Sequence, residues 1–174
     1  MIDIVVFDID GTLTDRNSEI PDSIDDAVKQ LKSHKNTILI ATGRPPFEVM
    51  PEVKKRLMPD AIICYNGSLV MDSQGNILYE RYYEESLLHD LLSKIEEFGW
   101  DHAVHLSDKT LVLKGSSIQK KVMEISTKRP DLVVSKNRII PGPVYNIMVH
   151  VSDPDELEAL LKDFPQLKSE AFAE

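Results

Sequence analysis

The chain has 174 residues and a formal charge of −9 at neutral pH, with 20 Lys and Arg against 29 Asp and Glu. The hydrophobic fraction of 42% is that of an ordinary globular protein and excludes a wholly disordered chain. No run of about 18 or more apolar residues is present, so we expect no membrane span. The acidic balance disfavours nucleic acid as a partner, because that affinity comes largely from Lys and Arg on phosphates.

The N-terminus and the cysteine content bear on cellular location. The first six residues, MIDIVV, carry an aspartate and no basic cluster, unlike a secretory signal. Cys64 is the only cysteine, which excludes an internal disulfide and a cysteine-based zinc site. Its place in an apolar run predicts an inert, buried thiol. We therefore expect a cytoplasmic protein.

The first third of the chain alternates between apolar runs and helical spacing. Three short, β-branched apolar runs are typical of buried strands: residues 2–7, 37–41 and 61–64. Residues 24–31 carry apolar side chains on one helical face, with Ser23 as the expected N-cap. A second helix is expected after Pro45 and Pro46. This order predicts an α/β fold whose parallel sheet is covered by helices on both faces.

The pattern changes after Asn66. Strands are predicted at residues 68–71, 76–80, 110–114 and 145–151, and helices around residues 88–95, 118–125 and 157–164. Gly99 is expected to end the first of these helices, and Asp153 with Pro154 to begin the last. This half predicts an antiparallel sheet with helices on one side. We place the boundary at residues 80–85, which predicts domains at 1–81 and 82–174.

The residues that point most directly to chemistry follow the first predicted strand, in the sequence Asp8-Ile9-Asp10-Gly11-Thr12-Leu13. Ligands of open α/β sheets bind beyond the carboxyl ends of the strands. There one aspartate can attack a phosphate as a nucleophile and a second can donate or accept the proton. Mg²⁺ can neutralise the phosphate charge, and Gly11 lets the chain turn sharply with its N–H near a phosphate oxygen.

Two further motifs follow the next two predicted strands. Thr42, Gly43 and Arg44 offer a hydroxyl, a backbone N–H and a guanidinium, all suited to a phosphate. Asn66, followed by another glycine, comes after the third strand. Each motif alone is ordinary loop chemistry, and paired aspartates can simply cap a turn. Their convergence at one sheet edge favours a site.

Taken together, these three motifs resemble those of haloacid-dehalogenase-like (HAD) hydrolases of the Cof type. The resemblance implies a Rossmann-like (Rossmannoid) parallel sheet in residues 1–81 and an α+β cap domain from residue 82 onward. It also implies a phosphoric monoester hydrolase, a Mg²⁺-dependent phosphatase of a small phosphorylated metabolite such as a sugar phosphate. The reaction would pass through an aspartyl-phosphate intermediate.

The resemblance also assigns roles to individual residues. Asp8 would be the nucleophile and Asp10 the general acid and base, and both would bind Mg²⁺, Asp8 through its carboxylate and Asp10 through its main-chain carbonyl. Thr42 would donate to the phosphoryl oxygens, with Gly11 and Gly43 beside it. Arg44 and Asn66 would lie near the substrate.

The family carries two more motifs after the cap, a lysine at a helix start and a Gly-Asp-x-x-Asn-Asp stretch. Neither is found. Lys114 and Gly115 form the nearest pair, but no acidic motif follows, and the acidic residues from Asp153 are better explained as a helix start. We therefore expect an incomplete core that ends in the cap and impaired catalysis, in either a fragment or a natural short form.

Two other functions remain open from the sequence. One is a non-catalytic HAD-like binding or interaction protein, favoured by the missing motifs. The other is a phosphoacceptor signalling domain, which would place an aspartate where this chain has Asn66. His102 and His105 are expected in a strand, as surface or cap-cleft residues and not as metal ligands, since positions i and i+3 of a strand face opposite sides.

Overall fold

The computed structural model describes residues 3–15, 19–49, 51–114, 131–135 and 139–169. The chain divides into two compact units, which are described one at a time. The first unit is Met1–Tyr82 with Leu106–Lys109, and the second is Tyr83–His105 with Thr110–Glu174. Within the described residues, no helix has the length and apolar character needed to cross a membrane. The helix predicted around residues 118–125 lies outside the described residues.

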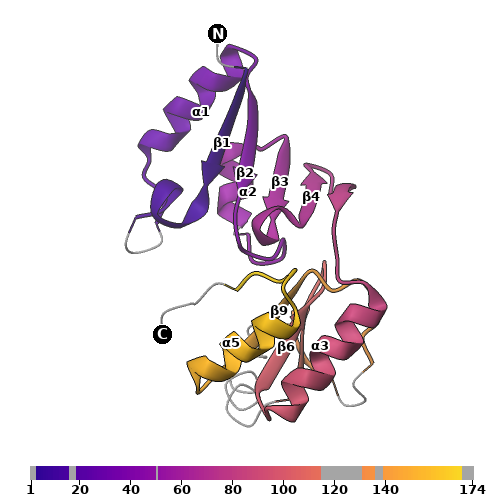
Figure 1. Ribbon diagram of the computed structural model, residues 1–174. Coiled ribbons are helices and arrows are strands. Elements are labelled where there is room, and N and C mark those ends of the chain that lie inside the picture. The colour runs from indigo at the N-terminus through magenta and orange to yellow at the C-terminus, as the bar shows by residue number, and fades with distance from the viewer. Residues whose placement is uncertain (1–2, 16–18, 50, 115–130, 136–138, 170–174) are drawn as a thin grey trace. The chain divides into compact units, whose positions relative to one another are not determined.

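The first unit is built on a mixed five-stranded sheet (Figure 1). Its strands, in spatial order, are β1 (Ile4–Asp8), β2 (Thr37–Ala41), β3 (Ala61–Cys64), β4 (Leu69–Asp72) and β5 (Ile77–Glu80). The first three strands are parallel, as the apolar runs predict. The predicted hairpin then adds β4 and β5 antiparallel to the edge of β3.

Helices α1 (Ser23–Ser33) and α2 (Pro51–Leu57) contact one another and so share one face of this sheet. The prediction of helices on both faces is therefore wrong for the described residues. The reason is topological, since two right-handed crossovers that advance in the same direction place both helices on the same side. Ile38 and Ile40 are fully buried, whereas Ile4 and Val6 on β1 are 58% and 52% exposed.

Two helix starts differ from their predicted positions. Asp22, and not Ser23, precedes the first turn of α1, and its side chain makes no capping hydrogen bond. Helix α2 begins at Pro51 instead of at Pro45 or Pro46. Glu48 N–H donates to the Pro45 carbonyl, so the first two prolines sit in a separate turn. All three prolines have the fixed φ that suits a first helical turn, and the sequence does not say which one begins the helix.

The second unit has a four-stranded sheet with two helices on one face. Its elements are α3 (Glu85–Glu97), β6 (Asp101–His105), β7 (Thr110–Lys114), β8 (Leu132–Val134), β9 (Asn146–His150) and α5 (Pro154–Asp163), and the strand order is β8-β7-β6-β9. Both helices contribute to one core cluster, and Ile147 and Val149 of β9 pack against it. The buried members of this cluster are Leu91, Ile95, Trp100 and Leu160. The predicted antiparallel pairing holds for β6 with β7 and β9, but β7 and β8 are parallel.

The predicted ends of the two helices are confirmed, whereas the two histidines are not where they were expected. Gly99 follows α3 with φ of +75°, and Asp153 caps α5 by accepting the Asp155 N–H at 3.0 Å. His102 and His105 are 0% and 7% exposed, so their prediction as surface or cleft residues is wrong. They lie on β6, which has a neighbouring strand on each side. The His102 Nδ1–H donates to the Trp100 carbonyl at 3.1 Å.

Candidate active site

The register of the three parallel strands brings the three sequence motifs to one sheet edge. Asp8 at the end of β1 pairs with Ala41 at the end of β2, and Ala41 pairs with Ile63 of β3. Because the strands end level, the loops that follow them start side by side. We refer to the predicted residues of these loops as the strand-end site: Asp8, Asp10, Gly11, Thr42, Gly43, Arg44 and Asn66.

The chain turns as soon as it leaves β1. Asp8 is extended, with φ of −81° and ψ of 153°, and residues 9–13 then form a wide, irregular helical turn. Gly11 has φ of +75°, a conformation in which any other L-residue is strained. Thr14 closes the turn, since its N–H and its hydroxyl both donate to the Ile9 carbonyl at 3.1 Å. Ile9 is buried, and the side chains of Asp8 and Asp10 are left exposed.

Asp10 is paired with Arg44 across the ends of β1 and β2. Arg44 Nε donates to Asp10 Oδ2 at 2.9 Å and Arg44 Nη2 donates to Asp10 Oδ1 at 2.6 Å. The hydrogen bond that Arg44 donates to this carboxylate is the main reason that the pKa of Arg44 is raised. Both carboxylate oxygens are therefore engaged by one guanidinium. The sequence indicates that both residues lie at the site but not that they bind each other.

The second and third motifs are joined through their backbones. Thr42 is 5% exposed, and its hydroxyl oxygen accepts the Arg44 N–H at 3.1 Å. The Asn66 N–H donates to the Thr42 carbonyl at 3.2 Å. A Cβ on Gly43 would stand 3.0 Å from Asn66 Oδ1, so the absence of a side chain lets the amide lie close to this loop. These contacts leave the Thr42 hydroxyl hydrogen available as a donor to an anion.

The donors present suit magnesium in kind but supply only part of a coordination shell. The Asp8 carboxylate and the Asp10 carbonyl are hard oxygen ligands, and Mg²⁺ is commonly held by one or two carboxylates together with waters and substrate phosphate. Within the described ranges, no group of three or more His, Cys, Asp or Glu residues is arranged to hold a metal ion. Both donors are therefore of the kind that would hold Mg²⁺.

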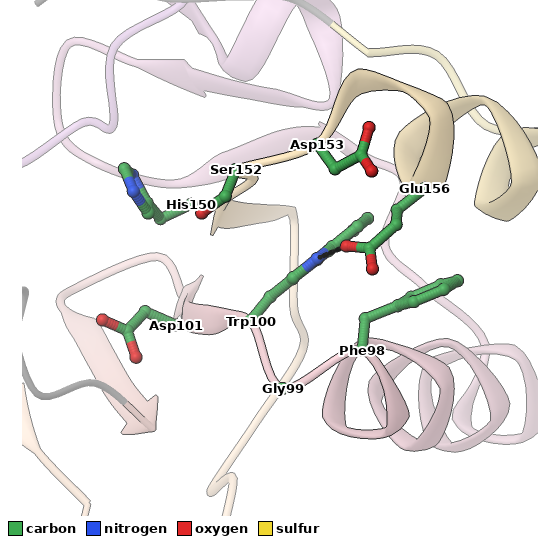
Figure 2. Close-up of a pocket in the computed structure, with 8 residues that line it drawn as sticks. All are labelled: Phe98, Gly99, Trp100, Asp101, His150, Ser152, Asp153 and Glu156. Atoms are coloured by element: carbon green, nitrogen blue, oxygen red, sulfur yellow. Dashed lines mark hydrogen bonds between the residues drawn. The ribbon is translucent and has the colours of Figure 1, made fainter.

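The second unit contains a cavity of about 400 Å³ (Figure 2). It is lined by Phe98, Gly99, Trp100, Asp101, His150, Ser152, Asp153 and Glu156. Phe98, Trp100 and Glu156 are engaged with one another. The Phe98 and Trp100 rings stack at 4.8 Å, and the Trp100 indole N–H donates to Glu156 at 2.8 Å. None of the strand-end residues lines this cavity.

The comparisons with known proteins agree on one family. A family profile described as haloacid dehalogenase-like hydrolase matches residues 5–173. The Bacillus subtilis protein named "Putative phosphatase YkrA" is 32% identical over 108 residues, which are 62% of this chain and 41% of that protein. A crystal structure of a hypothetical protein from Geobacillus kaustophilus has 27% identity and a TM-score of 0.79 over 97% of this chain and 64% of its own.

The fold is also that of a solved HAD subclass IIB sugar phosphatase, BT4131. That structure has 20% identity and a TM-score of 0.74, covering 94% of this chain and 64% of the solved chain. The present chain thus spans about two fifths to two thirds of the length of these relatives. The match of one family profile to nearly the whole sequence confirms the resemblance carried by the three motifs, and the chain belongs to the haloacid dehalogenase-like hydrolase family.

Proposed function

We propose that the strand-end site belongs to a Mg²⁺-dependent phosphatase that acts on a small phosphorylated metabolite. The observation that carries the proposal is the level ending of β1, β2 and β3, which puts two aspartates, a threonine, an arginine and an asparagine at one edge. The phosphatase names of relatives support it. The subclass IIB sugar phosphatase with the same fold supports a sugar phosphate as the substrate class.

The proposed reaction uses the two aspartates in sequence. An Asp8 carboxylate oxygen attacks phosphorus while the bond to the leaving oxygen breaks, and Asp10 gives that oxygen its proton. Asp10 then takes a proton from water, which attacks the aspartyl-phosphate and releases phosphate and free Asp8. Bound Mg²⁺ would offset the negative charge of the phosphoryl group and the Asp8 carboxylate. Thr42, Arg44 and the N–H groups of Gly11 and Gly43 would hold the phosphoryl oxygens.

The Asp10–Arg44 pair adds a requirement to this scheme. Both oxygens of the Asp10 carboxylate accept hydrogen bonds from Arg44. Asp10 must give up at least one of these bonds before it can reach the leaving group. An incoming phosphate is itself a bidentate partner for arginine. We therefore place Arg44 on the phosphate in the complex, which frees Asp10 to accept from solvent the proton that it then gives to the leaving oxygen.

The remaining assignments complete the proposal. The first unit would be the N-terminal part of the HAD core and the second its α+β cap, with the boundary near residue 82. The protein would work in the cytoplasm and would use neither nucleic acid nor membrane as a partner. Catalysis by this chain would be weak, because the lysine and the acidic stretch of the family are not among its 174 residues. Each such electrostatic partner is typically worth about 10²–10³ in rate.

A p-nitrophenyl phosphate assay with Mg²⁺ tests the proposal on the 174-residue chain of verified mass. We expect slow turnover that Asp8→Asn abolishes. Asp26→Asn, at an aspartate that is 88% exposed on α1, is the matched control and should leave the turnover rate unchanged. Turnover that survives Asp8→Asn would overturn the proposed nucleophile. Fast turnover would overturn the expected impairment.

A non-catalytic binding protein is the second candidate. The engagement of both Asp10 oxygens by Arg44 favours it, as does the partial metal shell in the described residues. In that case inorganic phosphate would bind at the strand-end site and the chain would show no turnover that depends on Asp8. Phosphate titration beside the hydrolysis assay separates the two candidates.

A further inference from the structure

Tyr65 stands next to Asn66 in sequence and has a hydrogen-bond partner outside the strand-end site. Its side chain is 3% exposed, and its hydroxyl donates to the Leu106 carbonyl at 2.6 Å. Leu106 begins a four-residue segment between β6 and β7 that belongs to the same compact unit as Tyr65. The acceptor is a backbone oxygen 41 positions along the chain. This bond therefore fixes the tyrosine from a segment that carries no residue of the site.

The backbone at Tyr65 has a conformation that side chains rarely adopt. Tyr65, Asn66 and Gly67 have φ values of 50°, 54° and 101°. Only glycine enters this left-handed region without a steric penalty. Two neighbouring residues with side chains persist there only where surrounding contacts hold them. At Tyr65, the hydrogen bond from the buried hydroxyl to the Leu106 carbonyl is one such contact.

The same turn is bonded to the loop after β2. The Tyr65 N–H donates to the Arg44 carbonyl at 3.3 Å, and the Asn66 N–H donates to the Thr42 carbonyl at 3.2 Å. The Asn66 amide oxygen then lies 3.0 Å from where a Cβ on Gly43 would be. The conformation of the turn thus decides where the Asn66 amide stands in the site.

We propose that Tyr65 is a positioning residue of this site. Its hydroxyl, anchored on Leu106, keeps the turn in its left-handed conformation and so holds the Asn66 amide close to Gly43, where it contacts a phosphoryl oxygen. Without the hydroxyl the turn relaxes toward ordinary backbone angles and the amide moves away. The inference rests on the proposed function, because it takes phosphate as the ligand that Asn66 meets.

The test uses NMR on the folded 174-residue chain with Mg²⁺ and inorganic phosphate as the probe. The variants are Tyr65→Phe, Asn66→Ala and the two combined. Tyr79→Phe, at a tyrosine that is 53% exposed on β5, is the matched control. The first readout is the nuclear Overhauser contact between the Asn66 side-chain amide and the Gly43 α protons. The second is the dissociation constant of phosphate from the shifts of the same two residues.

We expect Tyr65→Phe to lose the Asn66–Gly43 contact and to weaken phosphate binding about fivefold, the usual effect of one buried hydrogen bond. Tyr79→Phe should match the wild type. In the Asn66→Ala background Tyr65→Phe should have no further effect, because the tyrosine acts through the asparagine. A general loss of packing would weaken binding in both backgrounds.

Three results would overturn the inference and leave the proposed function standing. One is an unchanged contact and affinity in Tyr65→Phe, and another is an equal loss of affinity with and without Asn66. The third needs no variant and is the lack of the Asn66–Gly43 contact in the wild type. If phosphate shifts neither residue in the wild type while that contact is present, the phosphate site of the proposed function fails, and the inference fails with it.

Discussion

At the residue scale, the Asp10–Arg44 pair is the clearest departure from a site ready for chemistry. The pair is bidentate, yet the side chains are 57% and 29% exposed. Exposed ion pairs contribute about 0–1 kcal/mol to stability, so phosphate can replace the carboxylate at little energetic penalty. Under the proposed function, the pair would hold Asp10 and Arg44 in place until a substrate arrives.

Arg44→Lys tests this exchange. Lysine keeps the charge but offers a single point of contact where arginine offers a planar fork. We expect phosphate affinity to fall roughly tenfold, in line with about 1.5 kcal/mol for one charge-assisted hydrogen bond. The melting temperature should change little. Lys162→Ala, which removes an exposed ion pair to Glu158 on α5, is the control. Unchanged phosphate affinity in Arg44→Lys would remove Arg44 from the phosphate site.

Cys64 gives a prediction about pH. The side chain is fully buried at the end of β3, and burial raises the pKa of its thiol to about 11. Since the thiolate is the reactive form, we expect negligible labelling by iodoacetamide at neutral pH in the folded chain and full labelling in urea. At neutral pH the thiol is protonated in both the folded and the unfolded chain, so the raised pKa has no effect on stability there. The fold loses stability as the pH rises from the ordinary thiol pKa of 9.0 toward about 11, because only the unfolded chain can then ionise freely. Rapid labelling of the folded chain would contradict the burial.

At the element scale, Arg56 of α2 binds the backbone of the segment that precedes α1. Arg56 donates to the Ile20 carbonyl at 2.7 Å, the Pro21 carbonyl at 2.9 Å and the Asp25 carboxylate at 2.8 Å. The bond to Asp25 is the main reason that the pKa of Arg56 is raised. One guanidinium thus satisfies two backbone carbonyls and a carboxylate, which join the segment before α1 to α2.

Arg56→Lys should therefore lower the melting temperature by several degrees, because an ammonium group cannot reach both carbonyls and the carboxylate with the same geometry. Lys55→Met, at the exposed neighbouring position of α2, is the control and should leave the melting temperature nearly unchanged. Circular dichroism melts of the three proteins make the comparison. Equal melting temperatures for Arg56→Lys and Lys55→Met would show that the hydrogen bonds of Arg56 do not stabilise the unit.

At the scale of the whole molecule, the sheet of the first unit has an open edge at β1 among the described residues. Ile4 and Val6 on this strand are 58% and 52% exposed. An exposed apolar edge strand offers unpaired backbone groups and invites pairing with another chain. The melting and binding experiments above therefore need dilute protein.

Val6→Lys should reduce self-association of the 174-residue chain. A charge on an edge strand opposes strand pairing between molecules. Light scattering after gel filtration, at increasing protein concentration, measures the effect. Ile139→Lys, at an isoleucine that is 67% exposed outside the strands, is the control. If the wild type stays monomeric at high concentration, or if both variants behave alike, the β1 edge does not drive association.

The sequence predicts the elements of the fold well because their signals are local. Alternating or continuous apolar runs locate β1, β2, β3 and β7, and helical spacing locates α1, α3 and α5. The start of α2 is predicted less well, since Pro45, Pro46 and Pro51 carry the same local signal. The strand β8 is missed because three residues are too few to show a period.

For the strand-end site, too, some features follow from the sequence alone and others do not. By itself the sequence determined the family, through three motifs at the ends of predicted strands, and it placed Asp8, Asp10, Thr42 and Asn66 at one sheet edge. These inferences need only strand order and residue chemistry.

Only the tertiary structure decided which side chains meet. It pairs Asp10 with Arg44 and anchors Tyr65 on Leu106. It also buries His102 and places α1 and α2 on one face of the sheet. Each of these depends on groups brought together from distant parts of the chain. Local periodicity carries no information about such contacts, because it reports which face of an element is apolar and not which partner covers it.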